Sequence, residues 1–371
     1  IGDNMDRFHP ITEATNGKLN TIMLNKLGYD YATFGNNEGI TLDYNALSEL
    51  YNAATFQVLA ANLLEKDKKR PEWLTPFSIE KINGINVGFI GVTVYYKLFY
   101  DLLGWDLIDP FEAVEWCLQE IKEKVDVIIV LSHLGISDDE QLARRFPEID
   151  VILGGHTHHV LPEGKMIGTS LLCGAGKHGT YIGEVTVTVD NNETHKSCLL
   201  HSLVDVVPNL ELEQEINEAY ILAKKALGEP IVHIPNQLES NWFASSPLAS
   251  MLAEALKEWC KADIGMVNNG VILDSLEAGV VTAEQIHQIC PHPINPCKVE
   301  LTGEELREIV VEATKEEHEQ IHIKGLGFRG EVMGRMTYSN LEIIQEENKE
   351  GIKMIKEILI NNEPLQLTKT Y

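Results

Sequence analysis

The stretch from Asp150 to His159 constrains the fold of this chain more than any other. Its apolar run, Val151 to Leu153, is short and rich in β-branched residues, as in a strand covered on both faces. A glycine pair follows, which permits a sharp turn and a close approach to another group. His156 and His158 then alternate across one residue, so in an extended segment both rings would face the same side. Two neighbouring imidazoles at a strand end indicate a metal site. The alternative is a polar loop whose histidines only form hydrogen bonds.

Short apolar runs alternate with helical patterns as far as about residue 190, which predicts a layered α/β domain. We expect a loop at 35–39, strands at 29–34, 56–63, 87–94, 125–131, 151–153, 170–173 and 181–189, and helices at 18–27, 43–53, 110–124 and 138–146. The pattern weakens over 191–212, and an acidic helix is expected at 211–227. A second unit begins near residue 230, with a helix at 247–260, a strand at 264–267, a capped helix opening at Thr302, and strands with polar turns over 334–367.

Polar side chains follow the predicted strands repeatedly, at Asn36, His133, His156 and His158. In layered α/β folds, sites gather beyond the carboxyl ends of the strands. Together with Asp3, these residues offer oxygen and nitrogen ligands without a thiolate, a set that suits Zn²⁺, Mn²⁺ or Fe²⁺. Five candidate ligands exceed the three or four that one ion needs, roughly. We therefore expect two ions, about 3.5–4 Å apart, that share the Asp3 carboxylate. Such a pair of ions is suited to catalysing an in-line displacement at phosphorus.

Length and charge narrow the class of protein. With 371 residues the chain exceeds what one core holds, so two domains are expected. The formal net charge of −26 excludes binding to a nucleic-acid polymer or an anionic membrane surface, whereas metal ions would let a small anionic substrate bind. No apolar run is long enough for a transmembrane helix. Six scattered cysteines give no disulfide framework, which favours a cytoplasmic location. Because the chain opens at Ile1 without Met, we expect residues before it, and a signal peptide stays open.

Four motifs stand in a fixed order: Gly2-Asp3, Gly35-Asn36-Asn37-Glu38, Ser132-His133-Leu134-Gly135 and Gly154-Gly155-His156-Thr157-His158. The set resembles the calcineurin-like metallophosphoesterases, in particular the 5′-nucleotidase/UDP-sugar hydrolase branch and its YunD-like subgroup of Firmicutes. The resemblance implies a four-layer α/β/β/α domain over 1–207, a linker helix over 208–229 and a smaller α/β substrate-binding domain over 230–371, which we expect to continue beyond this chain. It also implies a bridging role for Asp3 and ligand roles for Asn36, His133, His156 and His158. The family's earliest motif, Asp-x-His, has no counterpart here.

The chain departs from the family pattern at two linked positions. The residue after the ligand Asn is usually a His that stabilises the transition state and protonates the leaving group, and here it is Asn37. The acidic partner of that His is replaced by Ile40. Asn37 can donate a hydrogen bond to developing charge but cannot carry a proton. Since general acid catalysis contributes roughly 10²–10⁴-fold, we expect slow chemistry or a substrate with a good leaving group.

The second half offers candidate substrate contacts. Asn269 and Gly270 open a stretch that resembles the Gly-rich segment of the branch's nucleotide-binding domain, although Leu273 replaces its usual Arg. The family's aromatic pair is not evident, and Asn295 is what remains near one of its positions. The loop 325–330 offers Phe328 for stacking and Arg329 for an anion. The alternative for that loop is a tight turn with a buried Phe.

These observations predict an enzyme of nucleotide catabolism, a two-metal phosphohydrolase in which metal-bound hydroxide attacks the phosphate ester of a nucleotide or a similar small substrate. One alternative is a 2′,3′-cyclic-nucleotide phosphodiesterase or a UDP-sugar hydrolase. Another is a metal- and nucleotide-binding protein with impaired catalysis, favoured by the loss of the His dyad. The presence of the candidate metal ligands argues against impaired catalysis, because burying a cluster of histidines that have no function costs free energy.

Overall fold

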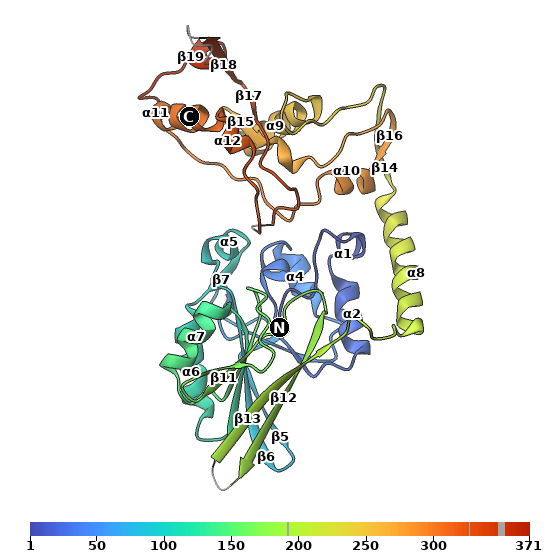
Figure 1. The fold of residues 1–371 in the computed structure, drawn as a ribbon, viewed down its shortest axis with the longest axis vertical. Coiled ribbons are helices and arrows are strands. Elements are labelled where there is room, and N and C mark those ends of the chain that lie inside the picture. The colour runs from blue at the N-terminus through green and yellow to red at the C-terminus, as the bar shows by residue number, and fades with distance from the viewer. Residues whose placement is uncertain (191–192, 326, 348–352) are drawn as a thin grey trace. The chain divides into compact units, whose positions relative to one another are not determined.

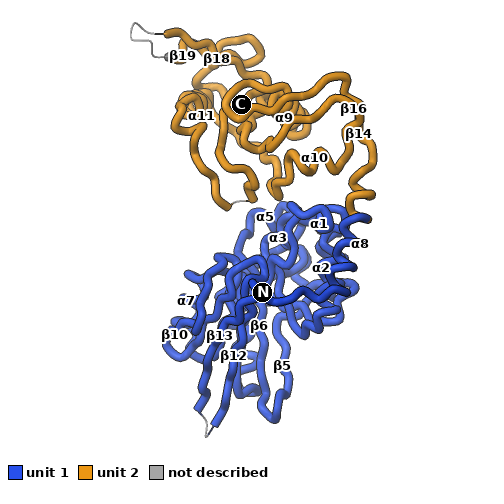
Figure 2. Tube along the Cα trace, turned by 45° about the vertical axis from the view of Figure 1, so that its right-hand side comes forward, with its two compact units in different colours: residues 1–221 blue, residues 222–371 orange. Residues whose placement is uncertain are grey.

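The computed structural model describes residues 1–190, 193–325, 327–347 and 353–371. The chain forms two compact units, Ile1–Ile221 and Leu222–Tyr371, coloured separately in Figure 2. The division falls inside helix α8 (Leu210–Leu227), where the linker helix was expected. Within the described ranges, no helix is long and apolar enough to cross a membrane.

A six-stranded sheet forms the centre of unit 1, in the order β10-β11-β9-β8-β6-β5. Its strands are β5 (Phe77–Ile82), β6 (Ile85–Thr93), β8 (Val127–His133), β9 (Val151–Gly154), β10 (Lys165–Ile167) and β11 (Ser170–Cys173). The four strands β6, β8, β9 and β11 are parallel to one another, as expected for apolar runs that are buried on both faces, while the edge strands β5 and β10 are antiparallel. Thr93 pairs with His133 and Ser132 with Gly154, so β6, β8 and β9 end at one edge.

Helices cover one face of this sheet and a hairpin covers the other (Figure 1). Helix α6 (Pro110–Ile121) starts with Pro110 and is capped by the Asp109 carboxylate, which accepts from the N–H groups of Phe111 and Glu112. With α7 (Ile136–Arg145), it buries an apolar stripe against β6 and β8. On the opposite face lies the antiparallel hairpin of β12 (Tyr181–Asp190) and β13 (Glu193–Ser202).

A second apolar cluster in unit 1 lies under a three-stranded parallel sheet of β1 (Tyr31–Ala32), β2 (Gln57–Leu59) and β4 (Leu74–Thr75). It is joined to the large sheet where the Ala61 N–H donates to the Gly91 carbonyl, 2.7 Å away. The remaining elements are α1 (Pro10–Thr15), α2 (Lys18–Lys26), α3 (Asn36–Gly39), α4 (Tyr44–Leu50), α5 (Lys97–Leu102) and the strand pair β3 (Leu63–Glu65) and β7 (Trp105–Leu107). This arrangement confirms the predicted mixed α/β class.

Unit 2 is built from small antiparallel sheets and helices. β14 (Pro230–Ile234) pairs with β16 (Gly279–Thr282), and β15 (Gly265–Asn268) with β17 (Met336–Ser339). β18 (Leu341–Glu347), β19 (Lys353–Ile360) and β20 (Glu363–Pro364) form a third sheet. The helices are α9 (Pro247–Cys260), α10 (Ala283–Ile289), α11 (Gly303–Ala313), α12 (Glu316–Glu319) and a 3₁₀ turn over Asn269–Val271. Thr302 and Glu305 form the expected capping box of α11.

Three local predictions were wrong. Residues 35–39 are not a loop, because Asn36–Gly39 form the helical turn α3. The segment after β9 is not extended, since His156 and His158 have φ of 63° and 55°, in the left-handed region. Strand β13 was not predicted. Its residues alternate between polar and partly buried ones and are not apolar enough to give a recognisable strand pattern after residue 190.

Candidate active site

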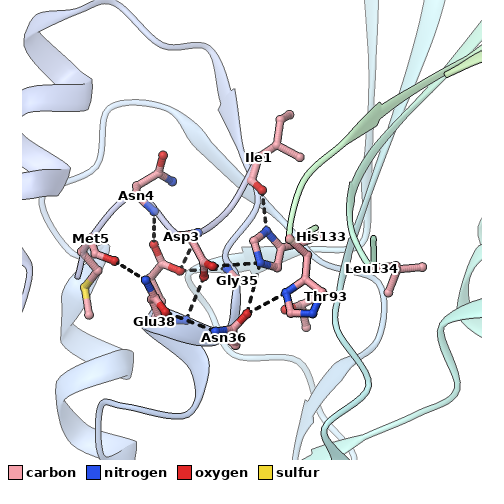
Figure 3. Close-up of polar contacts among 12 residues, drawn as sticks. Ile1, Asp3, Asn4, Met5, Gly35, Asn36, Glu38, Thr93, His133 and Leu134 are labelled. Carbon is pink, nitrogen blue, oxygen red and sulfur yellow. Dashed lines mark hydrogen bonds and ion pairs between the residues drawn. The ribbon is translucent and has the colours of Figure 1, made fainter. Parts of the chain in front are cut away.

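Four of the five predicted ligands meet beyond the edge where β6, β8 and β9 end, and Figure 3 labels three of them, Asp3, Asn36 and His133. Asp3 lies in the N-terminal loop, Asn36 begins α3, His133 ends β8 and His156 follows β9. Nε2 of His133 lies 3.3 Å from Oδ2 of Asp3 and 3.4 Å from Oδ1 of Asn36. Nδ1 of His156 lies 2.9 Å from the same Asn36 oxygen. One nitrogen of each ring therefore faces a shared space with two oxygens.

The amide of Asn36 is oriented by its neighbour. Asn37 donates from Nδ2 to the Met5 carbonyl at 2.8 Å, which directs its Oδ1 away from that carbonyl. This oxygen accepts a hydrogen bond from Nδ2 of Asn36 at 3.2 Å. The Oδ1 atom of Asn36 is thereby left to face the two imidazoles, as a ligand oxygen must.

Close backbone approach explains two of the motif glycines. A Cβ atom on Gly2 would lie 2.4 Å from Nδ1 of His133, and one on Gly35 would lie 2.2 Å from Oδ1 of Asp3. Gly2 also has φ of 75°, where a side chain would be strained. Both positions must therefore be glycine for His133 to reach Asp3.

Glu38 joins the two loops that carry Asp3 and Asn36. Its carboxylate is buried and accepts from three backbone N–H groups, those of Asp3 at 3.0 Å, Asn4 at 2.6 Å and Gly35 at 2.8 Å. Burial and the nearby Asp3 charge raise the pKa of Glu38, against the opposing effect of these hydrogen bonds. The side chain thus fixes the ligand loops without facing the ligand space.

Charge at the site follows from these contacts. Burial alone would raise the pKa of Asp3, but the hydrogen bond and charge of His133 and the Asn37 N–H outweigh it and lower that pKa. Burial lowers the pKa of His133, yet its contact with Asp3 outweighs burial and raises it. Burial and the neighbouring His133 lower the pKa of His156, which favours the neutral imidazole that binds metals.

The donor set fits a divalent cation. Ligand atoms of Asp3, His133 and His156 lie within 4.8 Å of one another, and the Asn36 oxygen borders the same space. Carboxylate, amide oxygen and imidazole suit Zn²⁺, Mn²⁺ or Fe²⁺. Within the part of the chain that the structure describes, His158 is not in this group of three. It lies on the exposed turn beyond His156, and its ligand role stays a prediction.

The predicted substrate residues lie in three neighbouring segments of unit 2. Asn269 is buried and held by protein partners, since its Nδ2 donates to the carbonyls of Asn241 and Ala244 and its Oδ1 accepts from Thr337. Gly270 packs so closely that a Cβ would lie 1.9 Å from the Val332 carbonyl oxygen. These contacts explain both residues through packing, and their substrate role stays a prediction.

His292 links the other candidates in unit 2. Its ring stacks on partly buried Phe328, with centroids 5.1 Å apart and planes 10° apart. Its Nε2 donates to the Val271 carbonyl at 2.7 Å, and its Nδ1 accepts from the Arg329 N–H at 2.8 Å. Asn295 is exposed on the following loop. Within the loop 325–330, Leu326 lies outside the described residues.

Sequence reasoning missed three residues around the site. Glu38 could have been found from its position three residues after Gly35, because a Glu at that spacing accepts from the N–H of the residue before a helix. Tyr96, whose hydroxyl lies 3.2 Å from Nε2 of His156, comes soon after a predicted strand, as the other site residues do. Asp139 in α7 accepts a short hydrogen bond from Ser132, next to His133, and the sequence carries no signal for it.

Comparisons with known proteins agree with this geometry. Residues 1–160 match the family described as calcineurin-like phosphoesterase, and residues 227–371 match the 5′-nucleotidase C-terminal domain. A Bacillus subtilis protein described as the uncharacterised metallophosphoesterase YunD is 45% identical over all of this chain and 81% of its own length. The trifunctional nucleotide phosphoesterase YfkN of the same organism is 26% identical over 79% of this chain, which spans only 24% of that protein.

The fold agrees as well. The crystal structure of a 5′-nucleotidase assigned from Staphylococcus aureus, solved with α-ketoglutarate, matches 96% of this chain and 75% of its own, with a TM-score of 0.68 and 18% identity. Family, fold and ligand geometry thus lead to one conclusion. The chain belongs to the calcineurin-like phosphoesterases that carry a 5′-nucleotidase C-terminal domain, and it is a metal-dependent phosphoester hydrolase.

Proposed function

We propose that the chain hydrolyses the phosphate ester of a nucleotide or a nucleotide-like molecule, and that it uses two divalent cations to do so. The observation that carries this proposal is the convergence of Asp3, Asn36, His133 and His156 on one space beyond the sheet edge. The 5′-nucleotidase C-terminal domain supports the nucleotide part of the proposal. Mn²⁺, Zn²⁺ and Fe²⁺ all suit the donor set.

Bound cations would supply Lewis acidity toward the phosphate oxygens and a water of lowered pKa. The residues of the chain provide the frame for that chemistry. Asp3 accepts from the N–H of Asn37 on Oδ1 and contacts His133 on Oδ2, so the orientation of its carboxylate is fixed, and this group would serve as the bridging ligand. Asn36 presents its amide oxygen, and His133 and His156 each present one ring nitrogen. His158 would complete the set from the adjoining turn.

Leaving-group protonation is the weak part of this site. Asn37 carries no proton to transfer, and its amide is engaged by Met5 and Asn36. Ile40, where the family usually has an acid, packs against the apolar cluster under the three-stranded sheet. We therefore expect turnover to be fastest with good leaving groups, which keeps cyclic nucleotide diesters and UDP-sugars as alternative substrates.

The nucleotide moiety is assigned to unit 2. The face of the stacked pair of His292 and Phe328 offers a flat aromatic surface, and the Arg329 backbone is fixed beside it. Asn269, Gly270 and Asn295 lie on the neighbouring segments. The partner is thus a small anionic ester rather than a nucleic-acid polymer, which a chain of charge −26 would repel.

All six cysteines are free thiols, which supports the prediction of a cytoplasmic location.

The proposal is tested by phosphate release from nucleoside 5′-monophosphates, 2′,3′-cyclic nucleotides and UDP-sugars, with Mn²⁺ and again after chelation with EDTA. We expect release from at least one nucleotide class that chelation abolishes and added Mn²⁺ restores. Release from none of them by a protein that retains bound Mn²⁺ would refute hydrolysis and favour the binding protein with impaired catalysis.

A further inference from the structure

Tyr96 lies beyond the carboxyl end of β6 and is not one of the predicted metal ligands. Its hydroxyl oxygen is 3.2 Å from Nε2 of His156. The two rings meet edge to face, with centroids 5.8 Å apart and planes 71° apart. Phe99 of α5 contacts the Tyr96 ring edge to face at 6.3 Å, which restricts the movement of the phenol.

The two nitrogens of His156 face different partners. Nδ1 points to the Asn36 oxygen, in the space that the other candidate ligands share. Nε2 points away from that space, to Tyr96. A metal-binding imidazole must have its ligating nitrogen deprotonated, so the opposite nitrogen carries the proton and needs an acceptor. Among the described residues, the acceptor that lies at Nε2 of His156 is the oxygen of Tyr96.

His133 shows the same arrangement with a different acceptor. Its Nε2 faces Asp3 and Asn36, and its Nδ1 lies 2.6 Å from the carbonyl oxygen of Ile1. The anchor of His133 is thus main chain, whereas the anchor of His156 is a side chain. His156 also has a left-handed backbone, which alone does not fix the ring. The orientation of the His156 ring therefore depends more on a side chain, that of Tyr96, than the orientation of the His133 ring does.

We propose that Tyr96 is a positioning residue that accepts a hydrogen bond from the Nε2–H of His156 and so holds Nδ1 unprotonated and aimed at the cation. This inference rests on the proposed function only in taking His156 as a ligand. The hydroxyl of Tyr96 contacts Nε2 of His156, the ring nitrogen opposite the one that faces Asn36. Groups that orient a metal-binding imidazole in this way contribute about 10- to 100-fold to metal affinity or activity.

The chain offers a matched control in Tyr95, the adjacent residue, whose side chain is exposed. Tyr96→Phe and Tyr95→Phe each remove one hydroxyl from the same segment. We would measure Mn²⁺ affinity by calorimetry in both variants, and the ring nitrogens of His156 by long-range ¹H–¹⁵N spectra of the protein loaded with diamagnetic Zn²⁺, the state in which Nδ1 faces a cation rather than donating to Asn36. His156→Ala identifies the His156 signals. The unfolding temperature in EDTA checks the fold.

We expect Tyr96→Phe to weaken Mn²⁺ binding by about 10- to 100-fold and to shift the Nε2–H signal of His156 in the Zn²⁺-loaded protein, because that group loses its acceptor, with an unchanged unfolding temperature. Tyr95→Phe should change neither quantity. Wild-type affinity and ring signals in Tyr96→Phe would overturn the inference, as would equal effects of the two variants. A protein that releases no phosphate but shows the Tyr96 effect would refute the proposed function and still support the role of Tyr96.

Discussion

Glu38 is the residue on which the position of the Asp3 loop depends most. Three backbone N–H groups, those of Asp3, Asn4 and Gly35, donate to its buried carboxylate. Among the described residues, these N–H groups have no other acceptor. Glu38→Gln turns an amide donor toward these donors. We expect a loss of about 1–3 kcal/mol in the free energy of unfolding, measured with urea in EDTA, and weaker Mn²⁺ binding.

A suitable control for Glu38→Gln is Glu49→Gln. Glu49 is exposed and pairs with Lys18 on the surface, so its replacement should cost less than about 1 kcal/mol. An unfolding midpoint for Glu38→Gln that equals that of the control would show that Glu38 does not hold the loops.

The replaced dyad makes a second prediction at the level of residues. Asn37→His restores an imidazole able to protonate a leaving group, and together with Ile40→Asp it restores the pair. Turnover of nucleoside monophosphates should rise by at least about tenfold, because a positioned acid contributes roughly 10²–10⁴-fold. Ile40 packs against an apolar cluster, so the double variant is compared with Asn37→His alone at a temperature where both are folded. No increase in either would mean that another step limits turnover.

The predicted ligands show how far individual site residues can be predicted from the sequence. Asn36, His133 and His156 were predicted to lie together because polar residues at the ends of parallel strands meet at one edge, and they do lie together, while their ligand roles stay a prediction. The rule gives positions along the chain but no ring orientation, so it placed His156 and His158 in an extended segment that the left-handed backbone contradicts. Tyr96 contacts the predicted ligand His156 and Asp139 contacts Ser132, the neighbour of His133, and such contacts depend on packing that no local pattern encodes.

Among the elements, α7 is tied to the site through Asp139. This buried carboxylate accepts from Ser132 at the end of β8 and lies against Gly154 at the end of β9. Burial raises the pKa of Asp139 from 3.8 to about 7, although the Ser132 hydrogen bond opposes this. The folded protein therefore holds this proton more tightly than the unfolded chain does.

The pH dependence of stability follows from that difference. The contribution of Asp139 is fully present below the unfolded pKa and is lost as the pH rises through the folded pKa, by up to about 4 kcal/mol. In EDTA, the free energy of unfolding of wild type should fall between about pH 5 and about pH 8 by a few kcal/mol more than that of Asp139→Asn. Exposed Glu148 provides the control Glu148→Gln, which should follow wild type. A difference between wild type and Asp139→Asn that does not vary with pH would contradict this account.

Elements with strong local signals were predicted best. The helix over Pro247–Cys260 has the bounds expected, because Ser246 caps it and Pro247 starts it. The strand at 170–173 is likewise as expected. The two-residue strand β1 was predicted too long, and the short strands β10, β14 and β16 were not predicted, since their length and burial are set by their sheet partners.

For the whole molecule, two domains were predicted because the alternation of strands and helices ends and an acidic helix follows. The chain forms two compact units that divide inside α8, and the predicted domain bounds stay a prediction. Its net charge of −26 makes anionic-substrate binding depend on cations at the site. We therefore infer that the group formed by Asp3, Asn36, His133 and His156 holds the cations on which hydrolysis depends.

That claim is tested most directly by measuring bound Mn²⁺ and phosphate release together in His133→Ala and His156→Ala. His195→Ala is the control, since His195 is exposed on β13. We predict that both site variants lose bound Mn²⁺ and turnover in parallel, while the control retains both. Wild-type turnover in either site variant would contradict the assignment of the site.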